Sequence, residues 1–286
     1  MRYQNVRAAK FLDRPNRFIA HVELDGAVET VHVKNTGRCR ELLIPGCTVY
    51  LEKGTNPNRK TAYDLIAVEK GETLINMDAQ APNKVFAEWA AAGGFLPDVT
   101  AIRPEYVYGA SRLDFCLETP GGLHLVEVKG VTLETDGKAL FPDAPTERGV
   151  RHIRELQRAA ESGLDAALFF VVQIRDIQSV APNDATHPAF GQALREAVAH
   201  GVRVLAYDCD VTPDSLTIRR EVPVVQTAPM AISPSAEAKA VSARVVSAVN
   251  TAAFTAFFIK SFIETLPFLR ISRDGLICLP APVPAR

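Results

Sequence analysis

Cysteine is scarce in this sequence and forms no recognisable motif. The five cysteines are scattered, odd in number and contain no C-x-x-C pair; they are Cys39, Cys47, Cys116, Cys209 and Cys278. Such usage excludes a disulfide framework and a zinc knuckle, and it favours a reducing compartment. The first residues also lack the apolar core of a signal peptide, so we expect a cytoplasmic protein.

Long apolar runs and familiar nucleotide motifs are missing as well. The apolar C-terminal part has 15 uncharged residues between Arg244 and Lys260. A bilayer span needs roughly 20, so we expect no membrane-spanning helix. The sequence has no G-x-G-x-x-G, Walker A or G-x-S-x-G motif and no H-x-x-x-H pair. Dinucleotide-binding, P-loop and α/β-hydrolase functions therefore have no motif to support them.

A large excess of either charge is absent too, because the formal net charge is -1 over 286 residues. Any nucleic-acid binding must then come from local patches. Residues 1–60 hold 11 Lys and Arg against 6 Asp and Glu. Three segments there mix basic with small polar residues, which suits phosphate contacts, and they contain Arg17, Arg38 and Lys60. A solvated basic face explains them equally well.

A β-hairpin is predicted over residues 111–129, and it contains the candidate catalytic residues. Residues 111–117 and 123–129 alternate as strands do, around a Gly-Gly turn. A two-residue loop at Gly121-Gly122 makes Asp114 face Lys129, whereas a loop of residues 119–122 makes it face Glu127. Both registers put these three side chains on one face, although a bulge would move Asp114 off it. The other face is apolar and holds Leu113, Phe115, Leu117, Val126 and Val128.

Two carboxylates and a lysine at this spacing suit phosphodiester hydrolysis. Asp114 and Glu127 can share a divalent cation, which polarises a phosphate and lowers the pKa of a bound water. Lys129 can orient that water or balance charge in the transition state. The alternative is an ordinary ion pair between the acids and Lys129, worth about 0–1 kcal/mol.

Three motifs closely resemble the SfsA (sugar fermentation stimulation protein A) family: residues 109–115 (GASRLDF), 126–129 (VEVK) and 141–149 (FPDAPTERG). The resemblance covers roughly residues 1–225. It implies an N-terminal OB-fold, a C-terminal domain similar to PD-(D/E)XK nucleases, and nucleic-acid binding. It also implies catalytic residues Asp114, Glu127 and Lys129, with Mg²⁺ or Mn²⁺ held by the two acids.

The predicted elements agree with that architecture. Strands are expected at residues 17–24, 29–35, 48–53, 61–70 and 73–78, which is the strand count of an OB barrel and equally of other small barrels. Asn83 is a candidate N-cap for a helix over 84–92. Helices over 147–161 and 188–200, and strands at 103–108, 166–172 and 202–207, complete a mixed sheet with helices on both sides. We therefore predict a mixed α+β fold, a five-stranded OB-like β-barrel followed by an α/β nuclease-like domain.

Further phosphate contacts are expected outside the barrel. Arg148 and His152 lie one turn apart on the 147–161 helix and are candidates to grip a phosphate, as is Arg112 beside Asp114. Pairing of the helix arginines with Glu147 and Glu155 is the alternative. Glu105 is a candidate third acid.

We predict an OB-like domain at residues 1–82, a nuclease-like domain at 83–225 and an atypical extension at 226–286 containing one amphipathic helix. The first functional hypothesis is a metal-dependent phosphodiesterase acting on DNA or RNA. The second is a DNA-binding regulator of sugar metabolism genes without turnover, and the third is a structural protein with an ion-pair network. A homodimer stays open as an alternative to a monomer.

Overall fold

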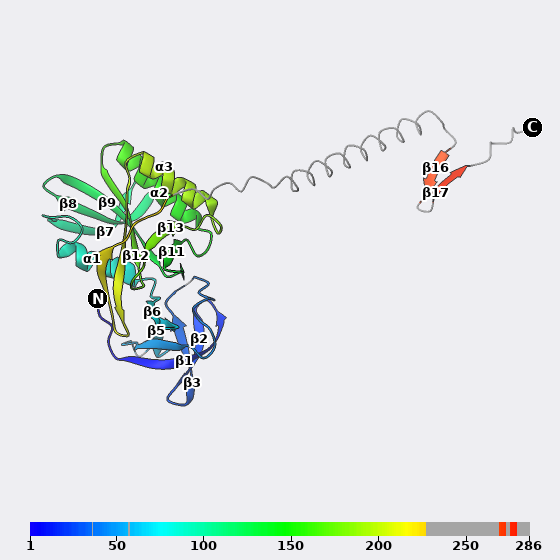
Figure 1. The fold of residues 1–286 in the computed structure, drawn as a ribbon, viewed down its shortest axis with the longest axis horizontal. Coiled ribbons are helices and arrows are strands. Elements are labelled where there is room, and N and C mark those ends of the chain that lie inside the picture. Colours follow the sequence, from blue (N-terminus) through cyan, green and yellow to red (C-terminus); the bar gives the residue numbers. More distant parts are fainter. Residues whose placement is uncertain (36, 57, 227–268, 273–274, 279–286) are drawn as a thin grey trace, which may run out of the picture. The chain divides into compact units, whose positions relative to one another are not determined.

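The structure is a computed structural model that describes residues 1–35, 37–56, 58–226, 269–272 and 275–278 (Figure 1). The chain forms two compact units, Met1–Ala228 and Pro229–Arg286. The second unit is described through one antiparallel hairpin, β16 (Leu269–Ser272) and β17 (Gly275–Cys278). The amphipathic helix predicted for the extension lies outside the described residues.

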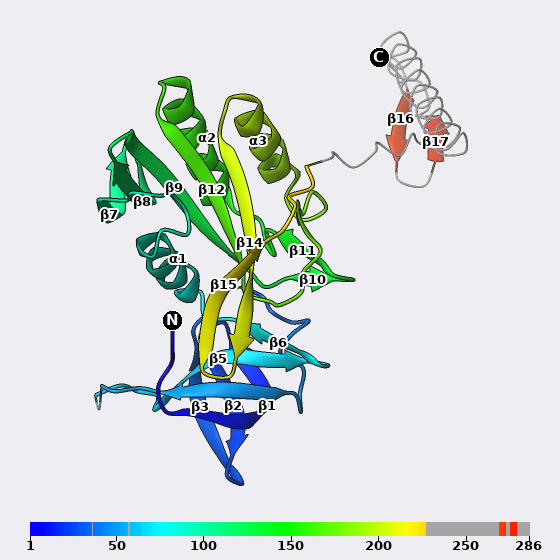
Figure 2. The same cartoon turned by 60° about the vertical axis from the view of Figure 1, so that its left-hand side comes forward.

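The N-terminal part is a closed barrel of five strands: β1 (Val6–Asn16), β2 (Ile19–Leu24), β3 (Ala27–Val33), β4 (Thr48–Lys53) and β5 (Tyr63–Lys70). Neighbouring strands are antiparallel in the order β3-β2-β1-β4-β5, and a parallel pairing of β3 with β5 closes the barrel. Strand β6 (Thr73–Asn76) extends β5 outside the closed set. This confirms the predicted OB-like barrel (Figure 2).

One of the five strands predicted for the barrel was nevertheless wrong. Strand β1 was missed, and the segment at 73–78 was counted in its place. Within β1 only Ala9 and Phe11 are buried, the charged residues between and around them are exposed, and bulges shift its register against β2. The period-2 signal that identifies a strand is therefore weak there.

The remainder of the first unit is an α/β domain around a six-stranded sheet, ordered β15-β14-β12-β9-β8-β7. The strands are β7 (Ala101–Tyr108), β8 (Ser111–Thr119), β9 (Gly122–Val131), β12 (Asp165–Val172), β14 (Arg203–Thr212) and β15 (Ser215–Glu221). Strand β12 pairs in parallel with β9 and β14, and every residue after Asp165 is buried. The predicted central strand is thus confirmed.

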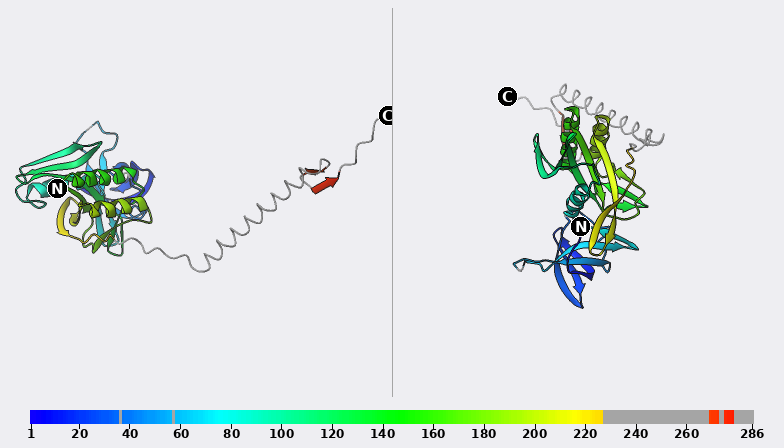
Figure 3. Two further views of the ribbon diagram at one scale, coloured as in Figure 1. Left: turned by 90° about the horizontal axis from the view of Figure 1, so that it is seen from above. Right: turned by 90° about the vertical axis from the view of Figure 1, so that its left-hand side faces the viewer.

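Helices cover both faces of this sheet. Helices α2 (Glu147–Glu161) and α3 (Pro188–Ala199) lie side by side on one face (Figure 3), and α1 (Ala81–Ala91) packs on the other. A small sheet of β10 (Glu134–Thr135), β11 (Lys138–Phe141) and β13 (Ser179–Pro182) was not predicted. Among the described residues, no helix is long and apolar enough to cross a membrane.

The residues that begin the helices agree with the prediction for α2 and differ from it for α1. Helix α2 has the predicted bounds, and Thr146 caps it, because its hydroxyl accepts a hydrogen bond from the Gly149 N–H. Asn83 was wrongly predicted as the cap of α1. That helix begins at Ala81 with Pro82 in its first turn, a position where the missing N–H of proline costs nothing. The Asn83 side chain is free for another contact.

Candidate active site at the β8–β9 hairpin

The hairpin has the register in which Asp114 faces Glu127. Thr119 pairs with Gly122 across the turn, and the ladder continues regularly to Phe115 opposite Val126. One further step in this register would place Asp114 opposite Glu127, but the regular pairing ends at Phe115. Lys129 lies two residues after Glu127 on the same face of β9. Of the two predicted registers, the structure has the one with the loop of residues 119–122.

The two faces of the hairpin differ from the prediction at one residue. Phe115, Leu117, Val126 and Val128 lie in the apolar cluster beneath α1, whereas Leu113 lies in the cluster beneath α2. Strand β8 therefore changes the direction of its side chains around Asp114. The regular ladder ends there, so Asp114 can reach groups that a regular strand would keep from it.

Asp114 is held from two sides. Its Oδ2 accepts a hydrogen bond from the main-chain N–H of Val128 at 2.8 Å, which takes the place of a ladder bond. Its Oδ1 accepts a hydrogen bond from Asn83 Nδ2 at 2.9 Å. Asn83 lies in the first turn of α1, so this contact connects the helix on one face of the sheet to the hairpin. This contact of Asn83 was not predicted from the sequence.

Glu127 is almost completely buried, with 1% of its surface exposed. Its Oε1 accepts hydrogen bonds from Lys129 Nζ and from Nδ1 of His152 on α2. Its Oε2 is buried and has no hydrogen-bond partner in the described part of the chain. A buried carboxylate oxygen without a donor costs about 1–3 kcal/mol, so the fold keeps one ionisable oxygen available at this position.

The two carboxylates have opposite pKa shifts. Burial and the neighbouring charge of Glu127 raise the pKa of Asp114 above its usual value. Burial also favours protonation of Glu127, but the hydrogen bond from His152 and the charge of Lys129 outweigh it and lower the pKa of Glu127. The site therefore combines two coupled acids whose repulsion a cation would relieve.

His152 differs from its predicted role as a phosphate contact. It is 5% exposed, and both ring nitrogens are engaged: Nδ1 with Glu127, and Nε2 as acceptor from Arg148 Nε at 3.3 Å. Arg148 itself is exposed, and neither it nor Arg151 pairs with a carboxylate among the described residues. On α2, Arg148 and Arg151 are therefore exposed, whereas His152 and Glu155 are buried.

The remaining predicted residues lie apart from the carboxylates. Arg112 is exposed and forms an ion pair with Glu105 at 2.7 Å, which leaves Glu105 out of the acidic pair. Arg17, Arg38 and Lys60 are exposed on the barrel and make no ion pair within the residues that the structure describes. They are therefore available to a ligand of the barrel.

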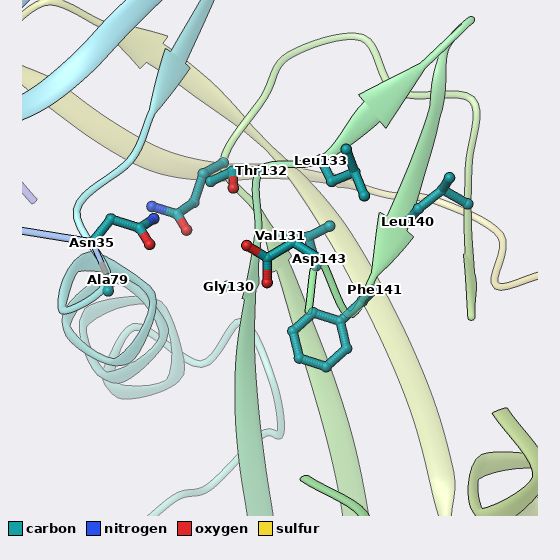
Figure 4. A pocket seen from close by; sticks show the side chains of 10 residues that line it. Asn35, Ala79, Gly130, Val131, Thr132, Leu133, Leu140, Phe141 and Asp143 are labelled. Carbon is teal, nitrogen blue, oxygen red and sulfur yellow. The ribbon is translucent and has the colours of Figure 1, made fainter. Parts of the chain in front are cut away.

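A cavity of about 120 Å³ begins immediately after the E-x-K segment. Its lining includes residues 130–133, Asn35 of the barrel, Gln173, and Asp143 from the 141–149 motif. Figure 4 shows Asn35 and Asp143 on facing sides of this cavity. A Cβ built on Gly130 would lie 2.5 Å from Gln173 Oε1, so the close approach requires glycine. Asp143 had been noted as part of a motif, without a role.

The described residues contain no group of three or more His, Cys, Asp or Glu side chains arranged to hold a metal ion. Mg²⁺ commonly takes one or two protein carboxylates and completes its coordination with water and substrate phosphates. Asp114 and Glu127 are the residues able to supply them.

Comparisons with known proteins match both parts of the first unit. The "SfsA N-terminal OB domain" matches residues 12–77, and the "Sugar fermentation stimulation protein RE domain" matches residues 80–215. The first match lies inside the segment predicted at 1–82, whereas the second begins at residue 80, three residues before the predicted start of the second domain at 83.

Curated relatives and a solved structure agree. A sugar fermentation stimulation protein homolog from Desulfitobacterium hafniense (strain Y51) is 56% identical over 216 residues, covering 76% of this chain and 94% of its own length. One from Clostridium beijerinckii is 52% identical over 225 residues, covering 79% and 100%. The structure of Pyrococcus furiosus SfsA in complex with Ca²⁺ has a TM-score of 0.73 and 29% identity, covering 79% of this chain and 98% of its own. The chain belongs to the SfsA (sugar fermentation stimulation protein) family.

Proposed function

We propose that this protein binds nucleic acid and hydrolyses phosphodiester bonds with a divalent cation, Mg²⁺ or Mn²⁺, held by Asp114 and Glu127. One observation carries the proposal: Glu127 Oε2 is buried, lies in a site with a second carboxylate, and has no donor among the described residues. A purely structural ion pair has no need for that free oxygen, because well-packed apolar side chains would be at least as stable.

The donor set fits such a cation. Both oxygens of Asp114 accept a single hydrogen bond each, so each keeps a lone pair. Hard divalent cations prefer carboxylate oxygens of this kind. The relative from Pyrococcus furiosus was solved in complex with Ca²⁺, which supports cation binding by the shared fold.

The cation, when bound, would polarise a substrate phosphate and make a bound water more acidic. The chain's own residues would do the rest. Lys129 Nζ lies beside Glu127 and can donate hydrogen bonds to the charge that develops on the phosphate. Asn83 and His152 act as positioning residues, because each holds one carboxylate in place through a hydrogen bond. For this reason we assign His152 to positioning in preference to the predicted phosphate contact.

Substrate phosphates away from the reacting bond would contact exposed arginines. Arg148 at the start of α2 has no carboxylate partner among the described residues, so its charge is available. Arg112 would have to exchange Glu105 for a phosphate, and we expect it to contribute less. On the barrel, Arg17, Arg38 and Lys60 would hold the strand outside the reaction centre.

The experiment compares cleavage and metal binding in one set of variants. Labelled single- and double-stranded DNA and RNA are incubated with Mg²⁺ or Mn²⁺ and with wild type, Lys129→Ala, Glu127→Gln or the exposed control Lys10→Ala. We expect Lys129→Ala to lose at least about 100-fold in rate, the usual cost of removing a stabilising donor. Glu127→Gln should also lose Ca²⁺ binding, measured by calorimetry. Wild-type cleavage that survives both substitutions would refute the assignment.

A non-catalytic regulator is the second candidate. It is favoured by the unpaired basic residues of the barrel, which do not depend on the carboxylate site. In that case no substrate would be cleaved, yet wild type and Lys129→Ala would bind DNA equally and with strong salt dependence. Sequence-specific binding to promoters of sugar metabolism genes would then be the activity to measure.

A further inference from the structure

Four arginines surround one cavity on the barrel. The cavity has a volume of about 430 Å³, and its lining includes Arg14, Arg17, Arg38 and Arg40 but no acidic residue. Two of these arginines come from the β1–β2 hairpin, and two from the connection between β3 and β4. The cavity is therefore assembled from segments that are distant in the sequence.

Arg14 builds the cavity without being neutralised. Its guanidinium donates four hydrogen bonds to main-chain carbonyls, those of Arg17 (2.7 Å), Asn35 (2.7 Å), Gly37 (3.0 Å) and Arg38 (2.9 Å). These bonds tie the hairpin tip to the facing loop. Its Nε is buried and has no acceptor among the described residues. A guanidinium held by neutral carbonyls keeps its full charge for an anion.

The other three arginines project their charges into solvent around the cavity. Arg17, Arg38 and Arg40 are exposed, and none forms an ion pair in the part of the chain that the structure describes. Asp143, from outside the barrel, lies close to Gly37, because its Oδ2 would be 2.5 Å from a Cβ built on that glycine. Four cations around one hollow strongly favour an anionic ligand, and arginine forks suit phosphate oxygens in particular.

An exposed aromatic ring stands next to this cavity. Phe18 is 45% exposed, and the Arg17 guanidinium carbon lies 4.8 Å from its ring centroid. The main chain of Phe18 is fixed, because its N–H donates to Asn16 Oδ1 and its carbonyl accepts from the Val33 N–H. The ring is thus a flat exposed surface on a fixed main chain, next to the arginine cavity.

Phe18 also lines a second cavity of about 430 Å³, together with Lys34, Arg59 and Asp64. Arg59 forms an ion pair with Asp64, and Lys34 forms one with Asp78. This second cavity shares Ala79 with the smaller cavity beside Gly130, next to the candidate active site. A strand lying along these cavities would pass from the arginines, over Phe18, toward the E-x-K segment. Aromatic rings interleaved with basic side chains are typical of surfaces that bind single strands.

We propose that the arginine cavity (Arg14, Arg17, Arg38 and Arg40) binds a phosphate of a single-stranded nucleic acid, and that Phe18 stacks on a neighbouring unpaired base. The selectivity follows from Phe18, because base pairs in a duplex already stack on each other and present no free face. The inference rests on the proposed nucleic-acid-binding function and adds the substrate class and the residues that select it.

The test is equilibrium binding of fluorescent oligonucleotides to the full chain in EDTA, so that cleavage plays no part. Single-stranded DNA and RNA are compared with a hairpin duplex of the same length. We expect tighter binding of a single strand, in DNA, RNA or both. Phe18→Leu should weaken that binding about 5- to 150-fold, the range for loss of one stacked base, while Phe18→Trp retains it. Both changes are at a half-exposed position, so the fold is kept.

The arginines are tested through the salt dependence. Arg38→Ala and Arg40→Ala should each weaken binding and reduce the slope of log K against log salt by about 0.7, the value for one phosphate contact in a single strand. The control Lys10→Ala removes an exposed charge from β1 outside the cavity and should leave the slope unchanged. Equal affinity for duplex and single strand, or unaltered binding by Phe18→Leu, would overturn the inference.

The outcomes separate this inference from the proposed function. Selective single-strand binding without cleavage in Mg²⁺ would refute the nuclease and leave the inference standing. Cleavage by wild type that is matched by Phe18→Leu and Arg38→Ala would refute the inference and leave the nuclease. Inorganic phosphate is added as a competitor at the same concentration of phosphate groups as the oligonucleotide. If it alone displaces the strand, the cavity is a small-anion site, and the proposed stacking of a base on Phe18 is overturned.

Discussion

Replacing His152 by phenylalanine tests whether α2 holds Glu127 in place. The substitution keeps an aromatic ring of similar size on the helix and removes the Nδ1 donor. Glu127 would keep Lys129 as its one donor, in a position where the carboxylate is 1% exposed. Solvent cannot replace the lost hydrogen bond at such a buried oxygen, so the whole interaction is lost from the folded state.

The magnitude follows from the kind of bond that is removed. A hydrogen bond to a charged group contributes about 1.5–3 kcal/mol. In a folded unit of this size, 1 kcal/mol corresponds to about 2–4 °C in the melting temperature. We therefore expect His152→Phe to lower the free energy of unfolding by about 1.5–3 kcal/mol in urea titrations and the melting temperature by about 3–12 °C, in metal-free buffer.

The matched control is Arg148→Ala, since this exposed side chain contacts the other ring nitrogen of His152 at 3.3 Å. It should change stability by less than about 0.5 kcal/mol, as surface substitutions do. A double-mutant cycle with Glu127→Gln then measures the coupling directly. A cost of His152→Phe no larger than that of the control, or the same cost with and without Glu127→Gln, would refute the reasoning.

Two further predictions concern packing and pH. Gly130→Ala places a Cβ 2.5 Å from Gln173 Oε1, and urea titration should show a loss of about 1–3 kcal/mol, typical of overpacking; Gly121→Ala, in an open turn, should cost less. Burial raises the pKa of Asp64, but its hydrogen bonds to Arg59 outweigh this and the net pKa is lowered. Asp64 thus contributes stability that is complete above the unfolded pKa of about 3.9 and is lost as the pH falls through the lower folded value. The stability difference between wild type and Asp64→Asn should accordingly shrink below about pH 4, and a difference constant down to pH 2 would contradict the assignment.

Much of the α/β domain could be predicted from local patterns. The cap at Thr146, the continuously apolar segment at 166–172 and the period-2 alternation of the hairpin each specify an element without help from distant residues. Strand β1 could not be predicted in this way, because it buries two residues and bends at bulges. Its partners β2 and β4 decide its conformation, and they act only after the barrel closes.

In the candidate site, too, some features follow from residue spacing and others from tertiary contacts. The sequence by itself determined that Glu127 and Lys129 lie on one face of β9, because the two-residue period of a strand suffices for that. The same period fails at Asp114, where the regular pairing of β8 with β9 ends. Only the tertiary structure decided how the acids are held. Asn83 reaches Asp114 from 31 positions away, and His152 reaches Glu127 from 25 positions away.

The arginine cavity shows the same division. Single arginines were evident in the sequence as basic residues among small polar ones, without any indication that four of them surround one hollow. Arg14 bridges 21 to 24 positions to the 35–38 loop, and the absence of ion pairs around it among the described residues is a property of the folded barrel. Pattern and period act over a few residues, whereas burial, desolvation and charge pairing depend on neighbours that the chain brings together by folding.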